Sequence, residues 1–110
     1  MGHLTLHTSL AGRTAIIALV GELDIAGAAD LERELAGVEA GAVVIDLRGL
    51  GFMDSSGLRA LAVAAQRAQG AGRRFALVPG AAQVMRVFDV TRMRERLEFV
   101  GDPGEVIVGP

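Results

Sequence analysis

The sequence predicts an α/β domain, with a mixed, mostly parallel β-sheet of about four to five strands and about three to four α-helices packed against it. After an amino-terminal pair of strand-like segments, runs with helical spacing alternate with short β-branched runs. The connections between them are short, as in right-handed crossovers between parallel strands. With 51% hydrophobic and 22% charged residues, the composition is that of a globular protein. We therefore expect one domain over residues 1–110, with a core at about 4–100 and an irregular tail or short strand at 101–110.

The amino-terminal third is expected to form a β-hairpin followed by a helix. Leu4 and Leu6 alternate with polar residues, which indicates a half-buried strand. Residues 15–20 are continuously apolar and follow the polar turn at 12–14, so they are predicted to be the partner strand. From residue 26 the spacing becomes helical. The apolar face of this helix comprises Leu31, Leu35 and Val38.

A central strand and a loop are expected in the middle of the chain. Residues 42–47 are short, β-branched and continuously apolar up to an aspartate, which favours a strand covered on both faces. Residues 48–53 contain two glycines and are predicted to be a loop. The remaining expected elements are a helix through residues 58–65 with Gly70 just past its end, a strand at 74–78, a helix through 84–88, a strand around 97–100 and a last strand at 106–108.

Reactive side chains are scarce in this chain. There is no Cys, Lys or Tyr, which excludes disulfides, thiolate metal sites and lysine chemistry. A net charge of -2 gives no electrostatic drive toward nucleic acid or an anionic membrane. No uninterrupted apolar run reaches the roughly 18 residues of a membrane span, and the start lacks a signal-peptide pattern. We therefore expect a cytoplasmic protein with no membrane insertion, no nucleic-acid partner, no cofactor and no metal.

The polar segment between the central strand and the second helix is the strongest candidate site. Asp54, Ser55, Ser56 and Gly57 follow the predicted strand directly, and ligands gather at the carboxyl ends of strands in α/β sheets. Either Asp54 or Ser55 is expected to cap the helix. Inside a helix Gly57 would cost about 1 kcal/mol relative to Ala. Its expected role is to let another molecule approach the hydroxyl groups closely.

Catalysis by this segment is disfavoured. Neither serine lies in a Gly-x-Ser-x-Gly elbow, and a triad would have to recruit His3 or His7 from the first strand. Two imidazoles alone make an incomplete metal site. Asp54 as a phosphate acceptor would lack the lysine that receiver domains use. What remains is a serine hydroxyl that receives a phosphate from another protein, at a helix amino terminus that suits a dianion.

Three segments of the chain together resemble the STAS domain, specifically the bacterial anti-sigma-factor antagonists. Residues 21–24 (Gly-Glu-Leu-Asp) resemble the family's motif after its second strand. Residues 44–47 and 52–58 resemble its central strand and phosphorylation loop, and residues 87–91 resemble its third helix. Because the order and spacing also agree between about Gly21 and Phe99, the resemblance is more specific than one short motif.

The resemblance implies a function in transcription regulation by partner switching. It implies that Ser55 is phosphorylated by an ATP-bound anti-sigma factor that is a serine kinase. The unphosphorylated antagonist would bind this kinase and free the sigma factor, and a metal-dependent serine phosphatase would reset it. The antagonist itself would be no enzyme, and would be a monomer or weak dimer. The implied partner-binding residues are Asp54, Ser56, Gly57, Leu58, Glu22 and Asp24.

Two alternative functions and several departures from the family accompany this interpretation. The chain could instead be a non-catalytic STAS scaffold or accessory subunit of a signalling or lipid-transport assembly; a small serine hydrolase is disfavoured by the missing triad. For Glu22 and Asp24, solubility and helix capping are as good an explanation as an interface. Gly27 stands where the family commonly has a capping Thr, and Arg92 where it often has Gly. The family's carboxy-terminal helix is not evident in residues 101–110.

Overall fold

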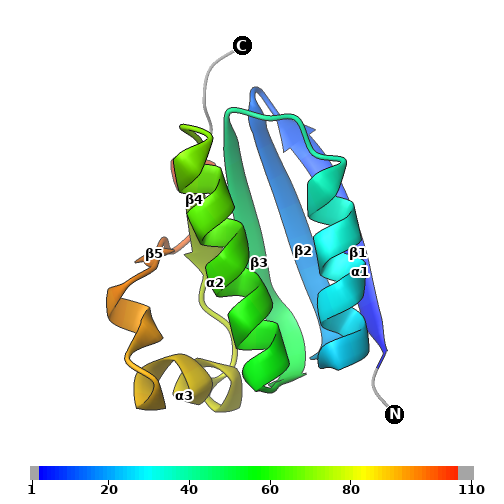
Figure 1. The fold of residues 1–110 in the computed structure, drawn as a ribbon, viewed down its shortest axis with the longest axis vertical. Coiled ribbons are helices and arrows are strands. Elements are labelled where there is room, and N and C mark those ends of the chain that lie inside the picture. The colour runs from blue at the N-terminus through cyan, green and yellow to red at the C-terminus, as the bar shows by residue number, and fades with distance from the viewer. Residues whose placement is uncertain (1–2, 107–110) are drawn as a thin grey trace.

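The computed structural model describes residues 3–106 as one five-stranded sheet with three α-helices packed against it (Figure 1). The predicted fold class is confirmed. The strands are β1 (Leu4–Ala11), β2 (Thr14–Leu23), β3 (Ala42–Met53), β4 (Arg74–Val78) and β5 (Glu98–Phe99), and the helices are α1 (Ile25–Ala36), α2 (Ser55–Gly70) and α3 (Ala82–Val90). Two short 3₁₀-helices, η1 (Met93–Glu95) and η2 (Pro103–Val106), complete the described part of the chain.

The strands lie in the sheet in the same order as in the chain. β1 pairs with β2 in antiparallel fashion, as the hairpin prediction requires, and every following pair is parallel. Each parallel step is a crossover of the same hand, so α1 and α2 lie side by side on one face of the sheet (Figure 1). Both helices begin at the same end of the molecule, where β2 and β3 end.

The main hydrophobic core fills the space between this face and the helices. Leu31 of α1, Leu61 of α2 and Phe88 of α3 are fully buried against the sheet. The rings of Phe88 and Phe99 are perpendicular to each other, with their centroids 5.3 Å apart. All residues that the strands contribute to this buried set are aliphatic, namely Ile17, Leu19, Leu23, Val43, Ile45, Leu47, Leu50, Met53 and Leu77.

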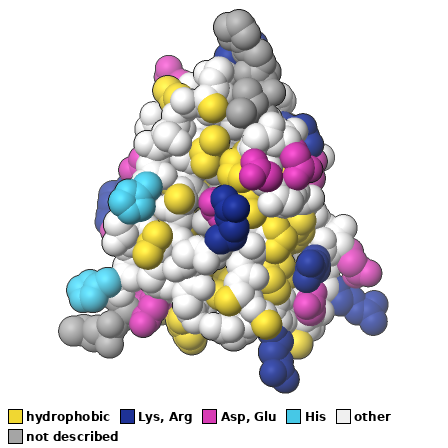
Figure 2. Space-filling model, turned by 180° about the vertical axis from the view of Figure 1, so that it is seen from behind, with side chains coloured by type: hydrophobic (Ala, Val, Ile, Leu, Met, Phe, Trp, Pro, Cys, Tyr) yellow, Lys and Arg dark blue, Asp and Glu magenta, His cyan; other side chains and the backbone are white. Residues whose placement is uncertain are grey.

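A smaller apolar cluster covers part of the opposite face of the sheet. Val44 and Val78 are buried there beneath Val100 and Val106, so the first half of β3 is covered on both faces as predicted. Val106 belongs to η2, so the prediction of a strand is wrong at this residue; residues 107–110 lie outside the described part. The Thr14 hydroxyl donates to the Val106 carbonyl at 2.7 Å, which ties η2 to the sheet. Figure 2 shows apolar side chains still exposed on this face.

The predicted loop at residues 48–53 is wrong, because β3 continues to Met53. Its second half pairs with the end of β2, from Val20 opposite Gly49 to Leu23 opposite Met53. Two register shifts accommodate this pairing, each with one extra residue in β3. A Cβ at Gly49 would lie 2.7 Å from a carbonyl oxygen of β2, so this glycine permits close strand approach and does not break the strand.

Two helix ends also differ from the sequence prediction. α1 ends at Ala36 with Gly37 as its C-cap, so Val38 lies beyond the helix, although it still packs partly against the core. Gly70 is the last residue of α2, one position further than expected. Arg92 adopts a left-handed backbone with φ of 59°, a conformation that glycine adopts more readily than other residues.

Candidate functional site

The candidate site lies at the edge of the sheet where β2 and β3 end side by side. The register places Glu22 opposite Phe52 and Leu23 opposite Met53. The residue after each strand is an aspartate that directly precedes a helix, and the Asp54 amide donates to the Leu23 carbonyl at 3.3 Å. The sheet therefore brings the amino termini of α1 and α2 together, as the carboxyl ends of parallel strands do.

Asp54 is the cap of α2. Its Oδ1 accepts hydrogen bonds from the backbone N–H groups of Ser56 at 2.9 Å and Gly57 at 3.2 Å. Its extended backbone, with φ of -109°, is that of an N-cap residue. Of the two capping residues that the sequence allowed, the structure selects Asp54. Ser55 is then the first helical residue, and it is exposed.

Asp24 caps α1 in the same way. Its Oδ1 accepts a hydrogen bond from the Gly27 N–H at 2.9 Å, which confirms the capping interpretation of this carboxylate. Gly27, expected at the family's capping position, is not the cap, because it is a buried residue inside the helix. A Cβ at Gly27 would lie 3.0 Å from the Glu22 carbonyl oxygen and 3.3 Å from Leu4 Cβ, so the helix packs closely on the strands there.

Gly57 is required by internal packing. A Cβ on this buried residue would lie 2.7 Å from both Cγ and the carbonyl oxygen of Leu23, and 2.8 Å from Met53 Cγ. The interpretation that Gly57 gives access to another molecule is therefore wrong, since the chain's own strands fill that space. Leu58 is also buried, with 7% of its surface exposed. Gly57 and Leu58 therefore pack the first turn of α2 against the rest of the domain, which fixes the position of Ser55, and they offer little surface to a partner.

The two helix starts share a sequence pattern that the sequence reasoning missed. Residues 23–27 and 53–57 both read apolar, Asp, two variable residues, Gly, and each follows a strand directly. The position after the aspartate is Ile25 in one copy, 74% exposed, and Ser55 in the other. Phe52 at the end of β3 is 47% exposed. The repeated Asp-x-x-Gly could have predicted the paired helix starts, but the exposure of Ile25 and Phe52 depends on the fold.

The structure brings most of the predicted site residues to this edge. Glu22 is exposed at the end of β2, Asp24 and Asp54 are partly buried as caps, and Ser56 is half-buried in the first turn of α2. We call the exposed residues of this edge, Glu22, Ile25, Phe52 and Ser55, the switch edge. His3 and His7, the only candidate bases for a triad, lie on the other side of β2, in or next to the outer strand β1.

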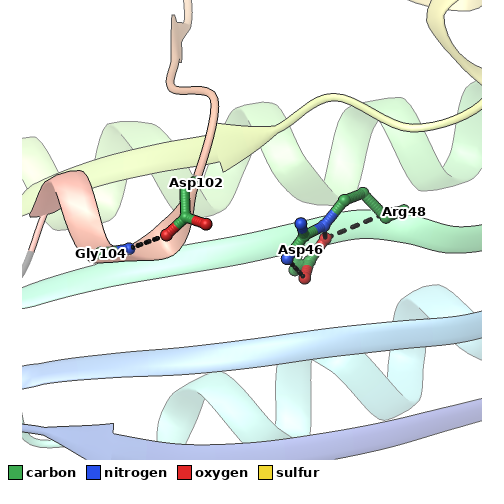
Figure 3. Close-up of polar contacts among 4 residues, drawn as sticks. All are labelled: Asp46, Arg48, Asp102 and Gly104. Atoms are coloured by element: carbon green, nitrogen blue, oxygen red, sulfur yellow. Dashed lines mark hydrogen bonds and ion pairs between the residues drawn. The ribbon is translucent and has the colours of Figure 1, made fainter.

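Asp46, part of the motif that resembles the family's central strand, has a structural role on the face without helices (Figure 3). It shares this face with Val44, two residues earlier in β3. Arg48 donates to its two carboxylate oxygens from Nε at 2.9 Å and Nη2 at 2.8 Å. The guanidinium of Arg48 holds the pKa of Asp46 below its ordinary value, against the opposing effect of burial. In the nearby turn, Asp102 accepts a hydrogen bond from the Gly104 N–H at 2.7 Å.

This ion pair predicts a loss of stability in acid. The pKa of Asp46 is lowered in the folded state, so its contribution is complete above the unfolded value of about 3.8 and is lost as the pH falls through the lower folded value. We expect the free energy of unfolding, measured with urea from pH 7 to pH 2.5, to fall less steeply below pH 4 in Asp46→Asn than in the unmodified protein. Equal slopes for the two proteins would contradict this assignment.

The mixed, mostly parallel sheet, the paired helix starts and the exposed serine after a capping aspartate together define a STAS-type domain. The chain belongs to the STAS domain family: the family model described as "Mlab, STAS domain" matches residues 6–101. No curated protein matches the sequence. None of the helices formed by residues 3–106 is long and apolar enough to cross a membrane.

Similar solved structures agree with this fold. An anti-sigma factor antagonist from Mycobacterium paratuberculosis superposes with a TM-score of 0.85 at 22% identity, covering 96% of this chain and 94% of that one. The antagonist SpoIIAA in its unphosphorylated form gives 0.77 at 19% identity, with 93% of each chain covered. The Bacillus SpoIIAA in its phosphorylated form gives 0.73 at 18% identity, covering 93% and 96%. At these identities the likeness is one of fold.

Proposed function

We propose that this protein is an anti-sigma factor antagonist in a phosphorylation-controlled partner switch, with Ser55 as the phosphate acceptor. The observation that carries the proposal is the exposed Ser55 at the first position of α2, directly after its capping aspartate. The proposal is also supported by structures of the same fold that are named antagonists, one of them in both phosphorylation states.

The geometry around Ser55 gives a physical reason why a phosphate there would weaken binding to a partner. The helix amino terminus tolerates the added charge of about -1.5 to -2. However, the Asp54 carboxylate already accepts hydrogen bonds from the N–H groups of Ser56 and Gly57. These two N–H groups are therefore not free to donate hydrogen bonds to a phosphate on Ser55. The dianion would stay at the surface beside a carboxylate and repel an acidic or phosphate-bearing partner.

In this proposal the partner is an ATP-bound anti-sigma factor that is also a serine kinase. The unphosphorylated switch edge binds it and frees the sigma factor. The Ser55 hydroxyl then attacks the γ-phosphate of ATP, its proton passes to the kinase, and ADP leaves. A metal-dependent serine phosphatase restores the hydroxyl. The chain supplies the acceptor and no catalytic group, and acts as a single cytoplasmic domain over residues 1–110, a monomer or weak dimer.

The exposed apolar residues give the proposed interface its binding surface. Phe52 and Ile25 are large side chains exposed at the same sheet edge as Ser55. Buried aromatic anchors dominate the energy of many interfaces, and charged neighbours set the partner preference. Asp54 caps α2 and Ser56 lies in its first turn, while Glu22 adds negative charge at the rim.

A scaffold is the second candidate function. The matching family model is named for Mlab and not for an antagonist. In a scaffold or accessory subunit of a signalling or lipid-transport assembly, the switch edge would dock a partner without receiving a phosphate. Phosphate transfer to Ser55 therefore distinguishes the two candidates.

Incubation with ATP and a cognate anti-sigma factor kinase is expected to add one phosphate, located at Ser55 by mass spectrometry. Ser55→Ala should accept none, because the acceptor hydroxyl is gone. Ser56→Ala is the matched control and should still accept one, since the neighbouring half-buried hydroxyl is not the acceptor. A phosphate that persists in Ser55→Ala, or is lost in Ser56→Ala alone, would overturn the assignment of Ser55.

A further inference from the structure

A cavity of about 140 Å³ lies between α1 and α2, toward the carboxyl-terminal ends of the two helices. It is separate from the switch edge, which lies at the helix starts. Its walls are mostly apolar. They include Leu35 of α1, Val43 of β3, Phe75 of β4, and Ala60, Ala64 and Ala68 of α2.

The cavity exists because small side chains face the gap between the helices. Ala60, Ala64 and Ala68 are spaced by four residues, so they lie on one side of α2. Val43 and Phe75 are paired neighbours in β3 and β4 and form the floor. An apolar cavity of about 150 Å³ can hold a benzene molecule. A helix about 10 Å wide would not enter a space of this size, whereas a single aliphatic chain would.

Two arginines stand at the mouth of this cavity. Arg73 donates from Nη1 to the Val38 carbonyl at 3.1 Å, which holds its guanidinium in place and leaves its other N–H groups to donate. Arg67 is exposed on α2 beside the same opening. Glu32 is the one acidic residue among the lining residues. The mouth therefore carries a net positive charge and favours an anionic head group.

We propose that this cavity binds an aliphatic carboxylate of the medium-chain fatty-acid class. The hydrocarbon chain lies against the alanines, Val43 and Phe75, where it is removed from water. The carboxylate lies at the mouth and accepts charge-assisted hydrogen bonds from Arg67 and Arg73. The site is independent of Ser55, so this proposal can be tested separately from the proposed partner switch.

Titration of the isotope-labelled protein with sodium octanoate, followed by NMR, tests the proposal. We expect saturable shifts of backbone signals in residues 60–71 and at Val43 and Phe75. Acetate, which lacks the chain, and 1-octanol, which lacks the charge, should bind at least about tenfold more weakly. Equal affinity for octanol would overturn the role of the arginines, and absence of saturable shifts with octanoate would overturn the site.

Matched variants separate the head-group contact from a general charge effect. The double variant Arg67→Gln with Arg73→Gln should weaken octanoate binding about tenfold or more. The double variant Arg59→Gln with Arg96→Gln also removes two positive charges, both outside the cavity, and should leave the affinity unchanged. An equal loss in this control would contradict the proposed contact.

A substitution in the cavity tests the position of the chain. Ala64→Leu should fill the space and abolish octanoate binding, whereas Ala65→Leu, which lies outside the cavity, should not. The NMR spectrum reports whether each variant is folded. If Ala64→Leu is folded and binds octanoate undiminished, the proposal is wrong; if it does not fold, the arginine variants decide.

Discussion

Ser55→Asp is expected to lower the affinity for an ATP-bound anti-sigma factor kinase by roughly 5- to 150-fold, a coupling of about 1–3 kcal/mol. The substitution places a fixed negative charge at the exposed first position of α2, beside the carboxylate of Asp54. Ser55→Ala should retain the affinity, because it removes the hydroxyl without adding charge. Titration calorimetry with the kinase and a non-hydrolysable ATP analogue measures both variants.

Stability measurements show whether such a loss of binding comes from charge or from unfolding. A negative charge in the first turn interacts favourably with the helix dipole, by about 0.3–1 kcal/mol. The melting temperature of Ser55→Asp should therefore stay the same or rise while its affinity falls. Gln66→Glu adds the same charge at an exposed position in the carboxyl-terminal half of α2 and should leave the affinity unchanged. Undiminished binding by Ser55→Asp would remove the basis for a charge switch at this serine.

The element order could be predicted because each element has a distinct local pattern. The alternation of Leu4 and Leu6, the β-branched run at 42–47 and the helical spacing near Leu58 each indicate their element without tertiary information. The extension of β3 to Met53 could not be predicted in this way. Residues 48–53 lie in a strand because the end of β2 pairs with them, and Gly49 is explained only by a neighbouring carbonyl oxygen.

The candidate site was predictable in part, because its position also follows from a local pattern. Asp54 and Ser55 stand out in the sequence as polar residues between an apolar strand and a helix. Capping by Asp54 follows local rules, but its choice over Ser55 depends on the backbone geometry of the turn. The packing of Gly27 and Gly57 against other strands and the exposure of Phe52 are tertiary properties, and no local pattern carries them.

Gly57→Ala is expected to destabilise the fold by about 2–3 kcal/mol, in the range found for overpacked cores. The new Cβ would lie 2.7 Å from the Leu23 carbonyl oxygen, and a backbone atom in a paired strand cannot move aside as the end of a side chain can. Helix propensity acts in the opposite direction, since Ala is favoured over Gly by about 1 kcal/mol. The close contact should exceed this gain, and urea denaturation measures the difference.

Gly70→Ala is the matched control, because it makes the same change in the last turn of the same helix. A Cβ at Gly70 would meet no atom within 4 Å, so only the propensity gain remains. We expect Gly70→Ala to be unchanged or more stable by up to about 1 kcal/mol. If Gly57→Ala were stabilised to the same extent, α2 would not pack as closely on Leu23 and Met53 as the structure indicates. The first turn of α2 would then be free to move, and the switch edge would not hold Ser55 in a fixed position.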